Sequence, residues 1–336
     1  MRQISQMAGV SPSTVSRILS GSDFNVPIAA DTRERVLAIV AQLGYTPNPL
    51  ARALRGGHSS QLGLIVRDVA DPFFALAIDA ITSEARRRGY GVVLGHAHSQ
   101  AREAAALQEA LASTQHCDGT ILLGDLRDEP ELWTGGLDSP VPLVGLCQGR
   151  RSARMPVVNV DNAAGARLVL EHLYDLGHRR IAFVQGGWIG DGRERLMAYR
   201  AFMRARGLGI PKGYSQASDN DLPSGAAASR TLLSLPTRPT AIFAASDVVA
   251  LGVLKGASTS GVRVPSELSI VGFDDIPMAA FAIPSLTTVR QPIDDMARLA
   301  VCRLLELITR GPATSVEAPH LLAPTLVVRD SSAPRP

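Results

Sequence analysis

The sequence predicts a small all-α head followed by an α/β body of two doubly wound lobes. The first 46 residues carry apolar side chains at helical spacing. From residue 61 onward, short apolar runs alternate with longer helical segments, an order typical of parallel sheets with helices on both faces. The alternation runs through two sets, so the 336-residue chain is expected to form two lobes after the head.

The excess of basic residues is confined to the head. The chain has a formal net charge of +3, and residues 1–60 hold six arginines against three acidic residues. The remainder of the chain therefore carries no net charge. A basic head on a neutral body suits contact with a polyanion such as nucleic acid, although a solvated surface would show the same asymmetry.

Two short helices joined by a tight turn are predicted at the start of the head. Ile4 and Ala8 share one face of the first helix, which Gly9 ends. Ser11 suits the N-cap of the second helix, and Pro12 suits its first position. Such a pair forms a helix-turn-helix unit, with a generic helical packing unit as the alternative. The apolar side chains that the second helix directs inward are Val15, Ile18 and Leu19.

The outward face of the second helix is the candidate DNA-reading surface, because this helix enters the major groove in a helix-turn-helix. Arg17 has the donors to bridge O6 and N7 of a guanine, a contact that contributes about 1–3 kcal/mol of discrimination. Hydroxyl groups on the same face suit phosphate oxygens. The candidate DNA-binding residues here are Ser11, Pro12, Ser13, Thr14, Ser16 and Arg17.

A third helix is expected to complete a DNA-binding domain of residues 1–46. Asp31 and Glu34 stand at capping-box spacing, and Gly44 suits the C-terminal cap. The predicted apolar stripe of this helix is Val36, Leu37, Val40 and Leu43.

Residues 47–60 are predicted to form a hinge helix and a linker. Asn48 suits an N-cap, but a helix of about seven residues is marginal alone and is expected to form only against DNA or a second copy. Leu54 stands near Arg52 and Arg55, and an apolar wedge flanked by arginines is typical of proteins that kink the minor groove. A flexible linker is the alternative interpretation.

The chain resembles the LacI/GalR family of bacterial regulators over essentially its whole length. The resemblance is most specific in residues 8–19, 32–37, 43–48 and 51–55. It implies a homodimer on a pseudopalindromic double-stranded DNA operator, with Pro12, Ser13 and Arg17 at recognition positions and Leu54 as the wedge. Met1 falls where the family has an apolar residue of the first helix, so the true start is expected slightly earlier. The loop before the third helix is longer than the common form.

The effector-binding and dimerisation domain is predicted over residues 61–330. By resemblance, its two lobes are similar to periplasmic sugar-binding proteins, and the chain returns to the first lobe near Thr288. The first lobe is therefore assigned to about 61–160 and 289–322, and the second to about 161–288. Strands are expected at 62–66, 90–95, 120–123 and 141–146 in the first lobe, and at 181–184, 241–244 and 269–273 in the second.

Polar residues that follow these strands are the candidate effector contacts, because ligands of doubly wound sheets lie beyond the carboxyl ends of the strands. By resemblance, Arg195 and Asp274 are the main contacts, and Ser246 and Phe74 are secondary ones. Charged groups of this kind clamp vicinal hydroxyls, and aromatic faces stack on a ring. Ser246 and Asp247 would serve equally as helix caps. The candidate effector-binding residues are Phe73, Phe74, Arg195, Ser246, Asp247 and Asp274.

Two further positions bear on the effector. Cys147 stands where many relatives carry a polar ligand group. Asn220 lies in a loop where base-binding relatives stack an aromatic ring, so its amide favours a sugar or related polyol.

Other classes of function are disfavoured. No run of eighteen apolar residues suggests a membrane span, and the first thirty residues lack a secretory signal, so a cytoplasmic protein is expected. No metal cluster, cofactor motif or nucleophile elbow appears, which argues against an enzyme and leaves no catalytic candidates. The sequence therefore predicts a sequence-specific transcriptional regulator, most simply a repressor. A regulator that no longer senses a ligand and a solute-binding protein remain as alternatives.

Overall fold

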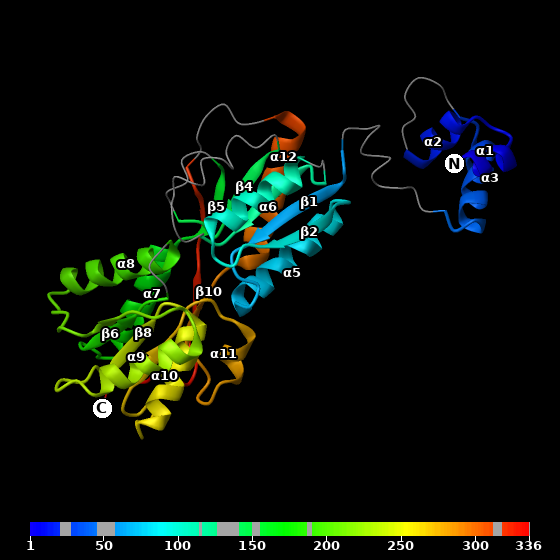
Figure 1. The fold of residues 1–336 in the computed structure, drawn as a ribbon. Coiled ribbons are helices and arrows are strands. Elements are labelled where there is room, and N and C mark those ends of the chain that lie inside the picture. The colour runs from blue at the N-terminus through cyan, green and yellow to red at the C-terminus, as the bar shows by residue number, and fades with distance from the viewer. Residues whose placement is uncertain are drawn as a thin grey trace. The chain divides into compact units, whose positions relative to one another are not determined.

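The computed structural model describes residues 1–20, 28–45, 58–113, 116–125, 141–149, 155–186, 190–311 and 318–335. The chain divides into two units, Met1–Ser59 and Ser60–Pro336, which are described separately (Figure 1). The first unit is helical and the second is α/β with two parallel sheets, so the predicted fold class is confirmed.

The described part of the head consists of three helices around a small apolar core. Gly9 ends the first helix in the left-handed conformation, with a φ of 65°, as its sequence position predicts. The helices are α1 (Arg2–Ala8), α2 (Pro12–Ser20) and α3 (Ala30–Gln42). The buried side chains of the core are Ile4, Ala8, Val15, Ile18 and Val36.

Two details of α3 differ from the sequence-based expectation. The helix begins before Asp31, with Ala29 as N-cap and no side-chain capping bond, so the expected capping box does not form. Leu37 and Leu43 are 46% and 37% exposed, whereas Val36 is fully buried. Only one side of α3 packs on the other two helices, and these leucines lie outside that narrower face.

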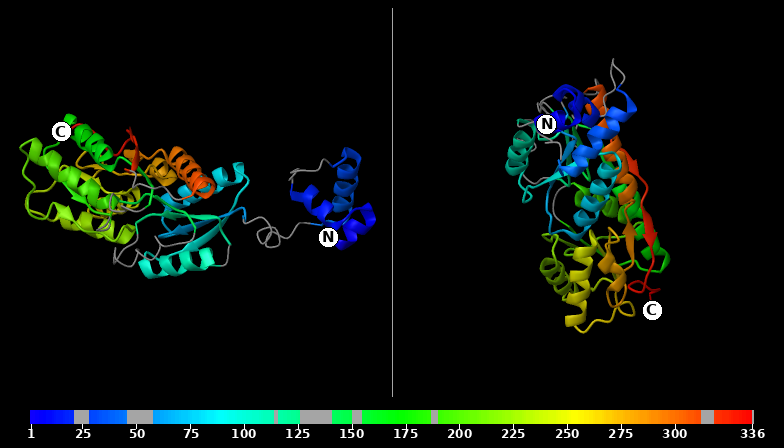
Figure 2. Two further views of the ribbon diagram at one scale, coloured as in Figure 1. Left: turned by 90° about the horizontal axis from the view of Figure 1, so that it is seen from above. Right: turned by 90° about the vertical axis from the view of Figure 1, so that its right-hand side faces the viewer.

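The first lobe of the body contains a six-stranded parallel sheet in the order β11-β5-β4-β3-β1-β2. Its central strands are buried on both faces, which explains their nearly continuous apolar sequences. The helices α5 (Pro72–Arg87) and α12 (Ile293–Arg310) cover one face, and α6 (Ala101–Ser113) covers the other (Figure 2). The strands are β1 (Gln61–Val66), β2 (Gly91–His96), β3 (Gly119–Leu123), β4 (Leu143–Leu146), β5 (Val157–Val160) and β11 (His320–Leu322).

The second lobe contains a four-stranded parallel sheet in the order β7-β6-β8-β9. Two pairs of helices flank it, α7 with α8 and α9 with α10 (Figure 1). The elements of this lobe are β6 (Ile181–Val184), β7 (Ser215–Gln216), β8 (Ala241–Ala244), β9 (Ser269–Val271), α7 (Asn162–Asp175), α8 (Asp191–Ala205), α9 (Leu222–Leu233), α10 (Asp247–Thr259) and α11 (Pro277–Phe281).

The chain passes between the lobes three times. It enters the second lobe after β5, returns through β10 (Thr288–Arg290) into α12, and leaves the first lobe again after β11 into β12 (Thr325–Val327). The strands β10 and β12 pair antiparallel.

The last residues complete the second lobe, which the sequence-based assignment ended at residue 288. Ser331 is fully buried, and its carbonyl accepts a hydrogen bond of 2.8 Å from the Ile270 amide. His178 is also buried and lies 3.1 Å from the carbonyl of Ala333. In the part of the chain that the structure describes, no helix is long and apolar enough to cross a membrane.

Candidate functional site

The outer face of α2 presents small polar side chains. Ser11 caps the helix, because its hydroxyl accepts a hydrogen bond of 3.1 Å from the Thr14 amide. The Ser11 hydroxyl also lies 2.7 Å from that of Ser13 and 2.8 Å from that of Thr14. Ser11, Pro12 and Ser13 are exposed, whereas Thr14, Ser16 and Arg17 are half-buried. All six candidate residues therefore lie at or beside the start of one helix whose opposite face fills the core.

The candidate hinge contacts Asn48, Arg52, Leu54 and Arg55 lie outside the described residues, since the structure describes nothing between residues 45 and 58. The predicted hinge helix and its wedge therefore stay predictions.

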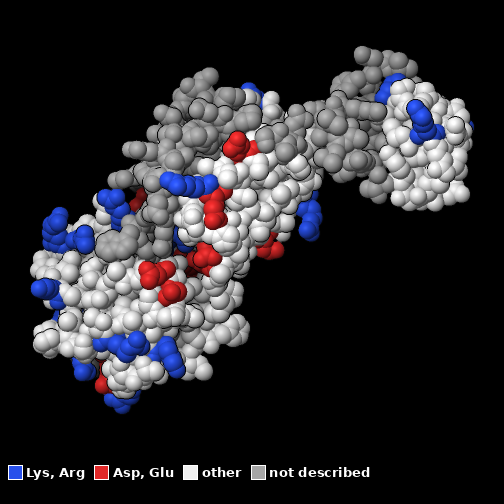
Figure 3. Space-filling model, in the orientation of Figure 1, with Lys and Arg blue, Asp and Glu red and all other residues white. Residues whose placement is uncertain are grey.

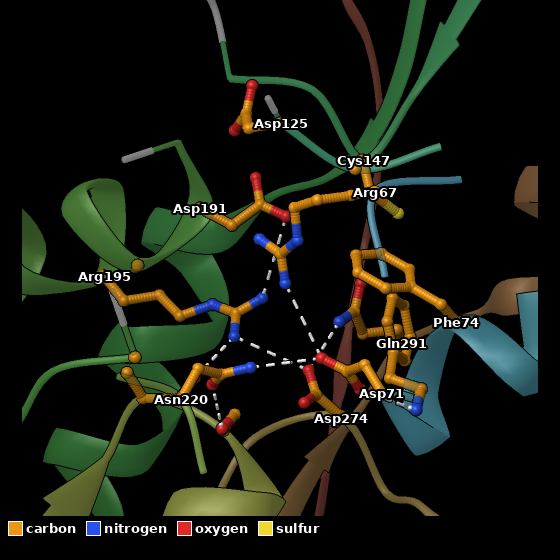
Figure 4. Close-up of a pocket in the computed structure, with 16 residues that line it drawn as sticks. Arg67, Asp71, Phe74, Asp125, Cys147, Asp191, Arg195, Asn220, Asp274 and Gln291 are labelled. Carbon is orange, nitrogen blue, oxygen red and sulfur yellow. Dashed lines mark hydrogen bonds and ion pairs between the residues drawn. The ribbon is translucent and has the colours of Figure 1, made fainter. Parts of the chain in front are cut away.

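A polar pocket lies between the two lobes of the body, at the carboxyl ends of the parallel strands, where doubly wound sheets bind ligands. We call it the inter-lobe pocket (Figure 4). Its cavity volume is about 50 Å³. The first lobe supplies Arg67, Asp71, Phe73, Phe74, Gly124, Asp125 and Cys147, and the rest of the wall is Gly186, Asp191, Gly192, Arg195, Asn220, Ala245, Ser246, Asp274 and Gln291.

Arg195 is held rigidly in the wall of this pocket. Its Nε donates to Oδ1 of Asn162 at 2.8 Å, and its Nη1 donates to the carbonyl of Ala245 at 2.5 Å. The guanidinium also lies over the Phe273 ring, 3.5 Å from the centroid. A planar, fully engaged guanidinium of this kind presents its charge to the cavity in one orientation.

Asp274 is the principal partner of Arg195, with Nη1 and Oδ1 3.5 Å apart. The Asp274 carboxylate also accepts a hydrogen bond of 2.7 Å from Nε2 of Gln291. Burial raises the pKa of Asp274 to about 7, against the opposing effect of Arg195. The backbone φ of Asp274 is 122°, a strained conformation for a residue with a side chain.

A chain of hydrogen bonds joins the lobes across the pocket. Ser246 Oγ donates to Oδ1 of Asn220 at 2.7 Å, and Asn220 Nδ2 donates to Oδ2 of Asp71 at 3.1 Å. Asp71 also caps α5 by accepting from the Phe73 amide, and it pairs with Arg67 at 3.6 Å. Desolvation raises the pKa of Asp71, with Arg67 opposing. The closed arrangement of the lobes is therefore stabilised by polar groups that also face the cavity.

Asp125 marks a second contact between the lobes. Both of its carboxylate oxygens accept from the Gly149 amide, at 2.9 and 3.0 Å. Gly190 of the second lobe approaches so closely that a Cβ there would lie 1.3 Å from Oδ2 of Asp125. Burial raises the pKa of Asp125 to about 7, with a further contribution from Asp191.

Asp191 is held by amides of the region between the lobes. Its Oδ1 accepts from Nδ2 of Asn159 at 2.8 Å and from Nδ2 of Asn162 at 2.9 Å. Its Oδ2 lies 4.0 Å from Nη2 of Arg195.

Asp247 is the one predicted effector-binding residue that does not line the inter-lobe pocket. It is fully buried, and its carboxylate accepts hydrogen bonds from the Thr288 hydroxyl and the Ile276 amide. These contacts tie α10 to β10 and give the side chain a structural role. The predicted residues that do line the pocket are Phe73, Phe74, Arg195, Ser246 and Asp274.

Several pocket residues were not among the effector contacts predicted from the sequence. Asp125 lies two residues after β3, so its position after a strand was an available signal, whereas Cys147, directly after β4, was noted in the sequence only for its lack of a polar ligand group. Gln291 follows β10, a strand that pairs with β12 more than thirty residues later in the chain. No local sequence pattern therefore predicts that Gln291 lies in the pocket wall. Backbone strain marks the site independently, because Cys147, Asn220 and Asp274 all have positive φ values.

The head and body together define a DNA-binding regulator with a ligand-binding module. Residues 1–48 match the family described as "Bacterial regulatory proteins, lacI family", and residues 170–332 match the "Periplasmic binding protein-like domain". The ribose operon repressor of Escherichia coli (strain K12) is 31% identical over 99% of each chain.

Two solved structures are similar to this chain over 98% of its length and 98% of the length of each solved chain. The Lac repressor dimer bound to operator and the anti-inducer ONPF is 28% identical with a TM-score of 0.87, and the transcriptional regulator CelR–cellobiose complex is 32% identical with a TM-score of 0.73. The chain belongs to the LacI family of DNA-binding transcriptional regulators.

Proposed function

We propose that this repressor binds a pseudopalindromic operator as a homodimer and that a sugar-like effector in the inter-lobe pocket controls its affinity for DNA. The observation that carries the proposal is one chain that joins a helix-turn-helix head to a pocket built around the Arg195–Asp274 pair. A guanidinium beside a carboxylate suits vicinal hydroxyls, which donate to one and accept from the other.

The DNA-binding surface in this proposal is the outer face of α2, with residues 47–60 as the hinge. Arg17 reads base edges and the serine and threonine hydroxyls contact phosphates. Two solved relatives support the dimer on DNA and the sugar-like effector. The Lac repressor structure is a dimer bound to operator, and the CelR structure is a complex with cellobiose.

An apolar patch on the second lobe supports the dimer. Phe281 is 86% exposed and Ile283 is 97% exposed, and Met278 of the same short helix as Phe281 is also exposed. Exposed aromatic and branched side chains of this size are typical of interfaces between subunits. Two copies joined through the body would place two heads on successive half-sites of one operator.

The effector acts, in this mechanism, by its different affinity for two arrangements of the lobes. The two lobes are held together by the Asn220–Asp71 hydrogen bond and by the close approach of Gly190 to Asp125, so a ligand that replaces these contacts changes the preferred arrangement. Couplings between such sites are typically ~1–3 kcal/mol, which corresponds to roughly 5–150-fold in operator affinity.

The decisive experiment is selection of bound duplexes from a randomised DNA library with the purified full-length protein at moderate salt. Enrichment of a pseudopalindrome supports the proposal and supplies the operator for measuring release or tightening by sugars. Weak binding with steep salt dependence and no enriched motif would refute sequence-specific recognition by this chain.

A further inference from the structure

The described wall of the inter-lobe pocket carries more negative than positive charge. It contains four carboxylates and two guanidinium groups, namely Asp71, Asp125, Asp191 and Asp274 with Arg67 and Arg195. On the face shown in Figure 3, acidic side chains also gather along the border between the two lobes. A cavity lined by one sign of charge concentrates ligands of the opposite sign.

Both guanidinium groups are already engaged. Arg67 pairs with Asp71 and lies 4.7 Å from the centroid of the Phe74 ring. Arg195 is occupied by Asp274 and by two further hydrogen bonds to the protein. Arg195 also lies 4.0 Å from Asp191, so two guanidinium groups are shared among four carboxylates and the wall keeps an excess of negative charge.

Asp125 is the least compensated of the four carboxylates. Within the described part of the chain, no arginine or lysine nitrogen lies within ion-pair distance of it, and only the Gly149 amide donates to it. Its neighbour Asp191 adds repulsion, and Figure 4 shows these two carboxylates on the same side of the cavity. A buried carboxylate without a cation is unfavourable unless a ligand supplies the missing charge.

A second, independent observation also calls for a hydrogen-bond donor. Gln291 is 4% exposed, and its Oε1 is buried without a hydrogen-bond partner, while its Nε2 donates to Asp274. Figure 4 shows the amide in the pocket wall between Phe74 and Asp274. Buried acceptors of this kind are usually satisfied, so the wall is organised for a ligand rich in donors.

We propose that the effector is a polyhydroxylated amine, an amino sugar or amino polyol, whose ammonium group binds between Asp125 and Asp191. The inference rests on the proposed function, because it specifies the chemical class of that effector. Hydroxyl groups of the same ligand donate to Asp274 and to Oε1 of Gln291. The ammonium supplies the charge that the two guanidinium groups do not.

The pH dependence of binding follows from the same geometry. The charged groups that face Asp125 are Asp191 and Glu194 of the second lobe and Arg67 of the first lobe. Because the pKa of Asp125 is about 7 before ligand binds, a cation that needs the ionised carboxylate displaces a proton near neutral pH. Affinity for a ligand whose ammonium group stays protonated above pH 8, such as 1-amino-1-deoxysorbitol, therefore rises between pH 6 and pH 8.

The test compares matched ligand pairs that differ by one amino group, by calorimetric titration of the full-length protein in a buffer without amines. The pairs are 1-amino-1-deoxysorbitol and sorbitol, glucosamine and glucose, and galactosamine and galactose. At pH 7 at least one amine should bind about tenfold more tightly than its hydroxyl partner, the difference expected when a charge-assisted hydrogen bond replaces a neutral one. Because 1-amino-1-deoxysorbitol is fully protonated at pH 7, its binding should release protons.

Variants locate the ammonium group. Asp125→Asn should remove most of the preference for the amine, and Asp191→Asn provides the same test if the first variant folds poorly. Asp175→Asn, an exposed carboxylate at the end of α7, is the matched control and should keep the preference.

Equal binding within every pair, tighter binding of the hydroxyl partner, or no binding of any amine would overturn the proposal. Operator selection with the same preparation distinguishes this failure from a failure of the proposed function, because a pseudopalindrome would still be enriched.

Discussion

Replacing Asp125 by asparagine should stabilise the ligand-free protein above neutral pH. The carboxylate is buried beside Asp191, and among the described residues it accepts hydrogen bonds only from the Gly149 amide, which an asparagine oxygen can also accept. A pKa of Asp125 that rises from 3.8 to about 7 on folding lowers the free energy of unfolding by about 4 kcal/mol at pH 8. Opening of the lobes rehydrates the carboxylate without unfolding the protein, which relieves part of this cost. We therefore expect the free energy of unfolding of Asp125→Asn to exceed that of wild type by about 1–2 kcal/mol.

The sign of the pH dependence is specific. Between pH 4 and pH 7 the folded protein retains a proton that the unfolded chain has released, so the contribution of Asp125 to stability falls as pH rises. Asp125→Asn and wild type should therefore unfold alike at pH 4 and diverge up to pH 7, with a thermal midpoint roughly 2–8 °C higher for the variant. Scanning calorimetry from pH 4 to pH 8 measures this, with Asp175→Asn as control. A variant that is less stable at pH 8, or a pH-independent difference, would refute the reasoning.

Four further changes test other parts of the molecule. Arg195→Lys keeps the charge but loses the planar fork, so effector affinity should fall at least about tenfold while thermal unfolding changes less; unchanged affinity in a calorimetric titration would contradict this. Gly190→Ala places a Cβ against Asp125 at a φ of 60°, so small-angle scattering should show a larger radius of gyration; an unchanged radius would argue against the close contact. Ser11→Ala removes the cap of α2 and should destabilise it by about 1 kcal/mol, seen as faster hydrogen exchange of its first amides in the intact protein; equal exchange rates would exclude the capping role. Ile283→Asp should convert the proposed dimer to a monomer in sedimentation experiments, and a persistent dimer would show that the apolar patch is not the interface.

Local patterns predicted most of the fold. The cap at Ser11, the left-handed end at Gly9 and the buried face of α2 depend on residues close in sequence, and the structure has all three. Continuous apolar runs likewise indicated the buried parallel strands, because both faces of such strands are covered and neither needs polar side chains.

Features that depend on distant parts of the chain were harder to predict. Leu37 and Leu43 have the periodicity of core residues, yet the neighbouring helices are too small to cover them. Asp247 has the position of a ligand contact after β8, but Thr288 and the Ile276 amide, which arrive much later in the chain, take up its carboxylate. The close approach of Asp125 to Gly190 exists only when both lobes are assembled, so no spacing along the sequence encodes it.

The three passages of the chain between the lobes determine when the body can fold during synthesis. The first sheet waits for α12 and β11, and the second sheet waits for Ser331, so neither core is complete until the last residues have left the ribosome. The core of the head, by contrast, is complete after residue 45. A nascent chain therefore carries a folded DNA-reading unit long before its ligand-binding lobes exist. Premature termination before β11 would damage both lobes together and leave that unit intact.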